Sequence, residues 1–217
     1  MKKLIAAGLF LAFLSGCAGL PGVGGGNPQI QSLEATTSVM VADFGTALDQ
    51  SATAYVSALS AVDNKTESAR IEAETKNLRE QDKDKMEASI GMLNEIDLSA
   101  ELEKSGELSA EGKKKLSKAM LHMGIAIFFD AKIATPAPSV VSDAKGIMQG
   151  LSPSDAMSAA SVKNIIANAS WIADIAPDQL SLLKKNFETL KEYANAHGIE
   201  VPSEEEIAQE ASGLSRE

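Results

Sequence analysis

A single apolar stripe over residues 28–62 is the feature that most constrains the fold. Core-type side chains recur there every three or four residues, which is the period of an α-helix with one buried face. The stripe consists of Ile30, Leu33, Thr37, Met40, Phe44, Leu48, Ser51, Tyr55, Leu59 and Val62. Its phase fails at Asp63 and Asn64. The pattern therefore predicts a long helix that ends at this point.

The next part of the chain is dense in charge. Residues 65–85 predict a solvated helix held by ion pairs, with a docking arm as the alternative. The apolar rhythm returns over residues 86–96. A four-residue motif occurs twice, as Leu98-Ser99-Ala100-Glu101 and Leu108-Ser109-Ala110-Glu111, and predicts turns with helix caps.

Proline and glycine divide the second half into helices. One helix is predicted from Ser109 to Ala134, where two prolines stop it, and a shorter one over residues 140–149. Ser152-Pro153-Ser154-Asp155 has the cap, the first-turn proline and the acid that start another helix.

Pro177 is expected to end that helix and to open the next, which runs to His197 with Gly198 as its stop. Ser203 and Glu206 form a capping box for a last, acidic helix.

No segment shows the alternation of a half-buried strand. The sequence therefore predicts an all-α fold: a single helical bundle of about five main helices over residues 29–200, without a β-sheet, followed by an acidic C-terminal helix and tail over 201–217. Aromatic residues are only 4% of the chain and alanine is abundant, which favours helices packed through small side chains. No run after the leader reaches membrane-spanning length.

The leader combines Lys2 and Lys3 with an apolar run over residues 4–14, which is too short to span a bilayer and typical of a secretory signal. It ends in Leu14-Ser15-Gly16-Cys17, and Cys17 is the only cysteine of the chain. This ending resembles the lipobox of bacterial lipoproteins. The resemblance implies that signal peptidase II removes residues 1–16 and that Cys17, acylated on its thiol and its new amino group, anchors the protein to a membrane.

Ala18 follows the cysteine where an aspartate would retain lipoproteins of Gram-negative enterobacteria in the inner membrane. The resemblance therefore implies an outer-membrane anchor facing the periplasm. Residues 17–28 are rich in glycine and are expected to form a flexible tether, with a reach of about 17 Å for ten residues.

Charge limits the partners of the chain. Removal of the leader takes away two lysines and no acidic residue, so the net charge of −10 becomes −12. Such a body has no basic footprint for nucleic acid, and an anionic lipid surface would repel it. Attachment to the membrane is therefore expected to depend on the lipid of Cys17.

Candidates for catalysis and metal binding are few. The chain has two histidines, and neither a calcium-loop spacing nor a phosphate loop after a strand occurs, so we expect no enzyme activity, no cofactor and no metal. Met120, His122 and Met123 would suit copper(I) by ligand type. His122 lies about 160° from Met120 around a helix, however, so core methionines beside a surface histidine are expected instead.

Two faces are candidates for binding. The helix over residues 116–134 is apolar on every side. It is therefore expected to be the central helix of the bundle or, alternatively, to present an apolar patch of Ile125, Phe128 and Phe129 to a partner. Asp130 in the same helix is expected to be partly buried and to need a hydrogen-bonding partner.

The second face is a row opposite the expected core stripe of its helix: Asn164, Asn168, Trp171 and Ile175. A ligand or a partner hot spot would use the two amides and the tryptophan, unless another helix covers the row. Without such a cover, Trp171 is expected to be partly exposed.

These features favour a non-catalytic envelope lipoprotein that serves an envelope protein partner as an adaptor, assembly factor or accessory subunit. The alternative is a carrier or sensor of an apolar small molecule or lipid, with a pocket lined by Ile125, Phe128, Phe129 and Trp171.

Overall fold

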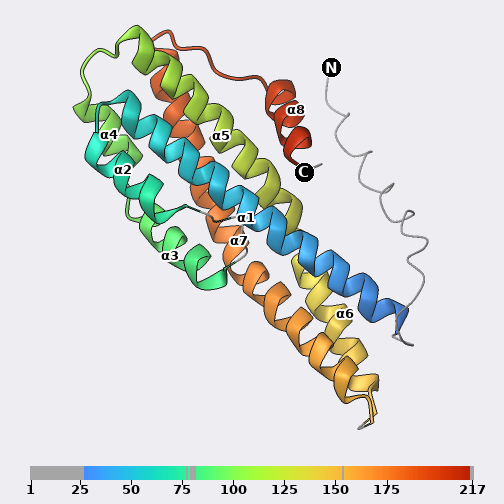
Figure 1. Ribbon diagram of the computed structural model, residues 1–217. Helices are drawn as coiled ribbons and strands as arrows, with labels where there is room; N and C mark the ends of the chain where they lie inside the picture. Colours follow the sequence, from blue (N-terminus) through green and yellow to red (C-terminus); the bar gives the residue numbers. More distant parts are fainter. Residues whose placement is uncertain (1–26, 77, 79–81, 153, 216–217) are drawn as a thin grey trace, which may run out of the picture.

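The computed structural model describes residues 27–76, 78, 82–152 and 154–215. No strand occurs among these residues, which confirms the predicted all-α class. Figure 1 shows three long helices as the frame of a bundle: α1 (Pro28–Ala61), α5 (Ala110–Ala134) and α7 (Ala156–Ala196). Shorter helices surround this frame, so the described part of the chain has fewer long helices than the five expected.

The long helix α1 begins and ends as its sequence predicts. Asn27 caps it by accepting a hydrogen bond from the backbone N–H of Gln29, and Pro28 occupies the first turn. The helix ends at Ala61, and Asp63 adopts a left-handed φ of 60° that turns the chain. The interruption predicted at Asp63 is therefore confirmed.

The charged segment forms short helices with their own caps. These are α2 (Lys65–Glu74), α3 (Lys83–Asn94) and α4 (Leu98–Lys104), capped by Asn64, Asp82 and Asp97. A single helix over residues 65–85 is therefore wrong, because α2 ends at Glu74 and Asp82 starts a new helix. Ser109 caps α5 through Gly112, as the second copy of the four-residue motif predicts, whereas Asp97 and not Ser99 caps α4.

Pro177 does not divide α7. The helix runs through it for 41 residues, so the two helices expected on either side of this proline are one. Proline in a helix interior costs about 3 kcal/mol because it removes a hydrogen bond and crowds the preceding turn. Burial of one continuous face offsets this cost, and that face keeps its phase across the proline: Val162, Ile165, Ala169, Ile172, Ala176, Gln179, Leu183, Asn186, Leu190 and Ala194.

Helix α5 is a long core helix, but it is not the most central one, because α1 packs against more of the other helices than α5 does. Helix α5 packs against α1, α7 and the C-terminal helix α8 (Glu204–Leu214), and after a turn at Thr135 and Pro136 it is followed by α6 (Ala137–Gly150). By length and composition, the stretch Ala110–Gly150 contains an 18-residue window apolar enough to cross a membrane. This differs from the expectation that no apolar run after the leader reaches membrane-spanning length. The bundle buries 44% of that window, and the core helix of a bundle has the same composition.

Candidate functional site

Three members of the predicted row on α7 line one groove. Asn164, Asn168 and Trp171 border a groove of about 260 Å³ between α7, α1 and α3. Helix α1 contributes Glu34, Thr37, Ser38 and Val41, and α3 contributes Lys83 and Met86. Both asparagines are exposed, and their amides offer hydrogen-bond donors and acceptors at the groove.

Trp171 forms the inner wall of this groove and is held from three sides. Its ring packs edge-to-face on Phe44 of α1, with 5.2 Å between the ring centroids. Its Nε1 donates a hydrogen bond to Glu87 Oε1 over 2.6 Å, and Lys83 Nζ lies 4.9 Å from the ring centroid. Trp171 is only 9% exposed, because α3 packs over it. The sequence did not decide whether another helix covers this row.

Ile175 does not share the groove with the other members of the row. It lies one turn further along α7 and borders a second groove of about 410 Å³, together with Ile90 and Asn94 of α3 and with Asp178 and Leu182. The predicted row is therefore divided between two grooves along α3: Asn164, Asn168 and Trp171 line the first, and Ile175 lines the second.

The chemistry of the first groove suits binding. Glu34 and Lys83 bring one negative and one positive charge to its walls, and Thr37, Ser38 and Ser161 add hydroxyl groups. No histidine or cysteine lines it. Among the described residues, no group of three His, Cys, Asp or Glu side chains could hold a metal ion. The groove can therefore hold a polar or charged segment by hydrogen bonds and ion pairs.

The predicted apolar patch on α5 lies largely under α8. Ile125 and Phe129 are 3% and 1% exposed and pack with Ala47 of α1 and Ala211 of α8 in a cluster apart from the main core. Phe128 is 38% exposed and lies edge-on against Phe129. Trp171 belongs to the main core, so the four aromatic and aliphatic side chains expected to line one apolar pocket lie in separate clusters.

Helix α8 approaches α5 closely at Gly124. A Cβ atom at this position would lie 2.5 Å from Cδ1 of Ile207, so the isoleucine side chain would have to move to admit a larger residue. Ser203 caps α8 by accepting from the backbone N–H of Glu206, as predicted. The C-terminal segment is therefore part of the packed bundle as far as Leu214.

Asp130 is buried in α5 more deeply than expected. Its side chain is 0% exposed, and neither carboxylate oxygen has a hydrogen-bond partner among the described residues. The prediction that Asp130 has a hydrogen-bonding partner is therefore wrong for the described residues. Burial raises the pKa of Asp130 well above its usual value, since the charged form loses its hydration.

The side chains of Met120 and Met123 point away from that of His122, as the helix geometry predicts. Both methionines are fully buried in the core, whereas His122 Nδ1 donates a hydrogen bond to Gln50 Oε1 of α1 over 2.7 Å. His122 is half-buried and not a surface residue, since it lies against α1. Burial, with a contribution from Lys118, lowers the pKa of His122 and favours its neutral form.

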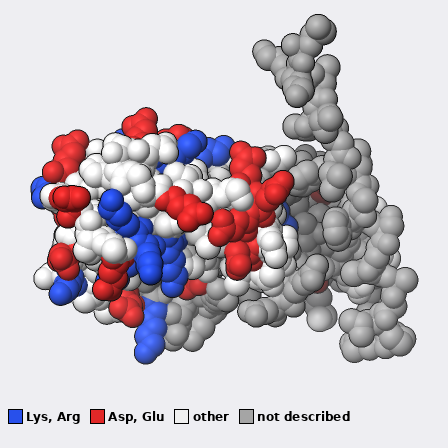
Figure 2. All heavy atoms as spheres, turned by 90° about the horizontal axis from the view of Figure 1, so that it is seen from above, with Lys and Arg blue, Asp and Glu red and all other residues white. Residues whose placement is uncertain are grey.

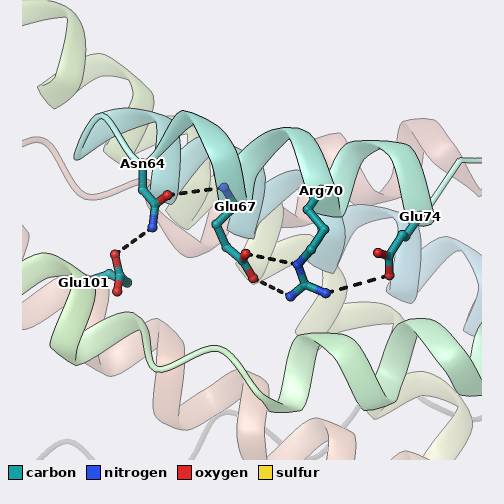
Figure 3. A network of polar contacts seen from close by, with 5 residues as sticks. All are labelled: Asn64, Glu67, Arg70, Glu74 and Glu101. Atoms are coloured by element: carbon teal, nitrogen blue, oxygen red, sulfur yellow. Dashed lines mark hydrogen bonds and ion pairs between the residues drawn. The ribbon is translucent and has the colours of Figure 1, made fainter.

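A polar network joins α2 to α4 at the surface (Figure 3). Asn64 caps α2 through the backbone N–H of Glu67 and donates from Nδ2 to Glu101 Oε2 over 2.8 Å. Arg70 pairs with Glu67 and, at 3.8 Å, with Glu74. The hydrogen bond from Arg70 lowers the pKa of Glu67. Exposed ion pairs of this kind add about 0–1 kcal/mol each, so the network contributes mainly to the relative orientation of these short helices.

Acidic side chains dominate the described surface. Figure 2 shows Asp and Glu spread over the upper face, with Lys and Arg gathered in smaller groups among them. Cys17 and the tether before Asn27 lie outside the described residues. No protein-family model matches the chain, and comparisons with curated proteins and with solved structures found no match.

Proposed function

We propose that this chain is a non-catalytic lipoprotein of the bacterial envelope, anchored to the outer membrane by lipid on Cys17, that binds a protein partner at the groove between α1, α3 and α7. The observation that carries the proposal is the placement of Asn164 and Asn168 on one wall of that groove, opposite Glu34 and Ser38 of α1. Exposed amides and side chains of both charge signs suit a polar protein segment.

A polar partner fits the groove better than an apolar small molecule does. Lys83 lies over the Trp171 ring, and Phe44 packs against the same ring, so little of the indole is free for an apolar ligand. The Glu87 hydrogen bond and the packing of Phe44 fix the position of the indole at the inner wall of the groove. Residues held in this way lose little conformational entropy on binding, which favours recognition.

Site-specific photo-crosslinking in living cells tests the proposal. A photoreactive amino acid at Ser38, which is exposed at the groove, should crosslink one discrete envelope protein. The same group at Ser99, exposed on α4, is the control and should not. Combined Asn164→Ala and Asn168→Ala substitutions should weaken the crosslink from Ser38 without changing the amount of anchored protein. Equal crosslinking from both positions, or no protein product from Ser38, would overturn the proposal.

A further inference from the structure

The anchoring segment joins the bundle at one end. Helix α1 begins at Pro28, and ten residues separate it from Cys17. The 34 residues of α1 extend for about 51 Å, whereas the sequence leads us to expect a reach of about 17 Å for the ten glycine-rich residues before it. The tether therefore keeps the Pro28 end of the bundle near the membrane, while the far end of α1 lies beyond its reach.

Two other helix ends meet at this place. Phe44 packs on Trp171 and Tyr55 accepts a hydrogen bond from Asn186, so α1 and α7 run parallel and begin at the same end. Near the start of α1, Gln29 and other residues form a groove with the last turns of α6. Figure 1 shows the start of α1, the end of α6 and the start of α7 together at one end of the bundle, here called the anchor end.

The anchor end is poor in charge. Residues 28–42 and 137–170 carry five charged side chains: Glu34, Asp143, Lys145, Asp155 and Lys163. These five sum to a net charge of −1, whereas residues 63–118, which form the helices at the other end and along α3, carry 14 acidic and 11 basic side chains, a net charge of −3. The repulsion expected between this acidic protein and a lipid surface is therefore weak where the tether begins.

Met157 is the most exposed large hydrophobic side chain of the described residues. It is 89% exposed in the first turn of α7, directly after the turn that joins α6 to α7. We propose that the anchor end rests on the lipid bilayer and that the Met157 side chain enters the boundary between headgroups and acyl chains. This inference rests on the proposed lipid anchor at Cys17.

A fluorescent label at residue 157 tests this contact in the lipidated protein. Cys17 is a thioether once it is acylated, so Met157→Cys provides a single free thiol for an environment-sensitive fluorophore. In phosphatidylcholine vesicles, nitroxide-labelled lipid should quench this fluorophore severalfold more than it quenches the same label at Ser99→Cys on α4. Aqueous iodide should show the opposite order.

A second pair of variants tests the side chain itself. Ala160 is exposed one turn from Met157, so a label at Ala160→Cys reports on the approach of the same face to the lipid. Met157→Asp should reduce lipid quenching of this label severalfold, whereas Met157→Leu should retain it. Both substitutions should leave the fold intact, because the side chain makes few contacts within the bundle.

Vesicle flotation separates the possible failures. Protein that does not float with the vesicles would show that the anchor itself is absent. Protein that floats while the label at residue 157 has the same lipid and iodide quenching as the label at Ser99 would overturn the membrane contact alone. Protection of residue 157 from both quenchers that grows with protein concentration would also overturn it, in favour of contact with a second copy.

Discussion

Trp171 of α7 donates a hydrogen bond from Nε1 to Glu87 Oε1 of α3 over 2.6 Å, and this bond joins the two helices beside the groove. The Trp171 ring is buried, while Glu87 is exposed to solvent on its other sides. The groove therefore depends on how α3 is held against α7, and a change at either residue should affect both stability and binding.

Trp171→Ala should destabilise the protein by about 3–5 kcal/mol, the cost typical of a buried aromatic side chain. The smaller cost expected for a partly exposed tryptophan does not apply, because α3 and Phe44 enclose the ring. Urea unfolding followed by circular dichroism measures this loss. Trp171 is the single tryptophan of the chain, so the native protein should give a blue-shifted tryptophan emission. Glu87→Ala should shift this emission to the red, whereas Glu87→Gln should preserve it. An unfolding free energy close to the native value for Trp171→Ala would contradict the observed packing.

Pro177→Ala should stabilise the protein, by about 1–3 kcal/mol. Alanine restores a backbone N–H to the interior of α7 and relieves the crowding of the preceding turn. The gain is smaller than the full helix-propensity difference, because proline also restricts the unfolded chain. Thermal and urea unfolding provide the measurement, and Asp174→Ala on an exposed position of the same helix serves as the control. A lower stability for Pro177→Ala would show that the proline itself is needed for the path of α7.

Gly124→Ala should loosen α8. The new Cβ atom would meet Ile207 Cδ1 at 2.5 Å, which outweighs the gain of about 1 kcal/mol that alanine brings to a helix interior. Hydrogen exchange should become faster over α8 and remain slow in α1 and α7. In an Ile207→Ala background the same substitution should stabilise α5, because the clash is gone. Equal effects of Gly124→Ala in both backgrounds would contradict this close contact.

Asp130→Asn should make stability less dependent on pH. Burial raises the pKa of Asp130, so the folded protein binds its proton more tightly than the unfolded chain does. The contribution of this group is complete below the unfolded pKa of about 3.9 and is lost as pH rises through the folded pKa. The native protein should therefore lose more unfolding free energy than the Asn variant between about pH 4 and about pH 8. Asp174→Asn, at an exposed position, should follow the native pH profile, and an identical profile for Asp130→Asn would contradict the burial of the carboxylate.

Cys17→Ser should leave an unprocessed precursor that carries no lipid. The hydroxyl group of serine cannot form the thioether that the resemblance to bacterial lipoproteins requires before cleavage by signal peptidase II. Immunoblotting of membrane fractions and metabolic labelling with a fatty acid measure the two effects. Processing of the variant to the native size, or labelling at the native level, would refute the proposed anchor.

Local sequence signals predicted most of the helices. Ser109 and Ser203 are caps whose side chains bond to N–H groups three residues further on, so they can be recognised without knowledge of the fold. The apolar period of α1 is equally local, and it indicated both the helix and its end before Asp63. At Pro177 a local signal was misleading, although the apolar phase that continues from Ile172 to Leu183 was already visible in the sequence.

The sequence by itself therefore determined the helical class, the starts of α1, α5 and α8 and which side chains share a face, because these properties depend on neighbours within about one helical turn. The start expected at Ser152-Pro153 was wrong, since α7 begins at Ala156. Only the tertiary structure decided what covers each face. Helix α3 encloses Trp171, α8 covers Ile125 and Phe129, and within the described part of the chain no hydrogen-bonding group reaches the Asp130 carboxylate. The physical reason is that an apolar face specifies burial but not its covering helix, which depends on how distant segments fit together through side-chain shape.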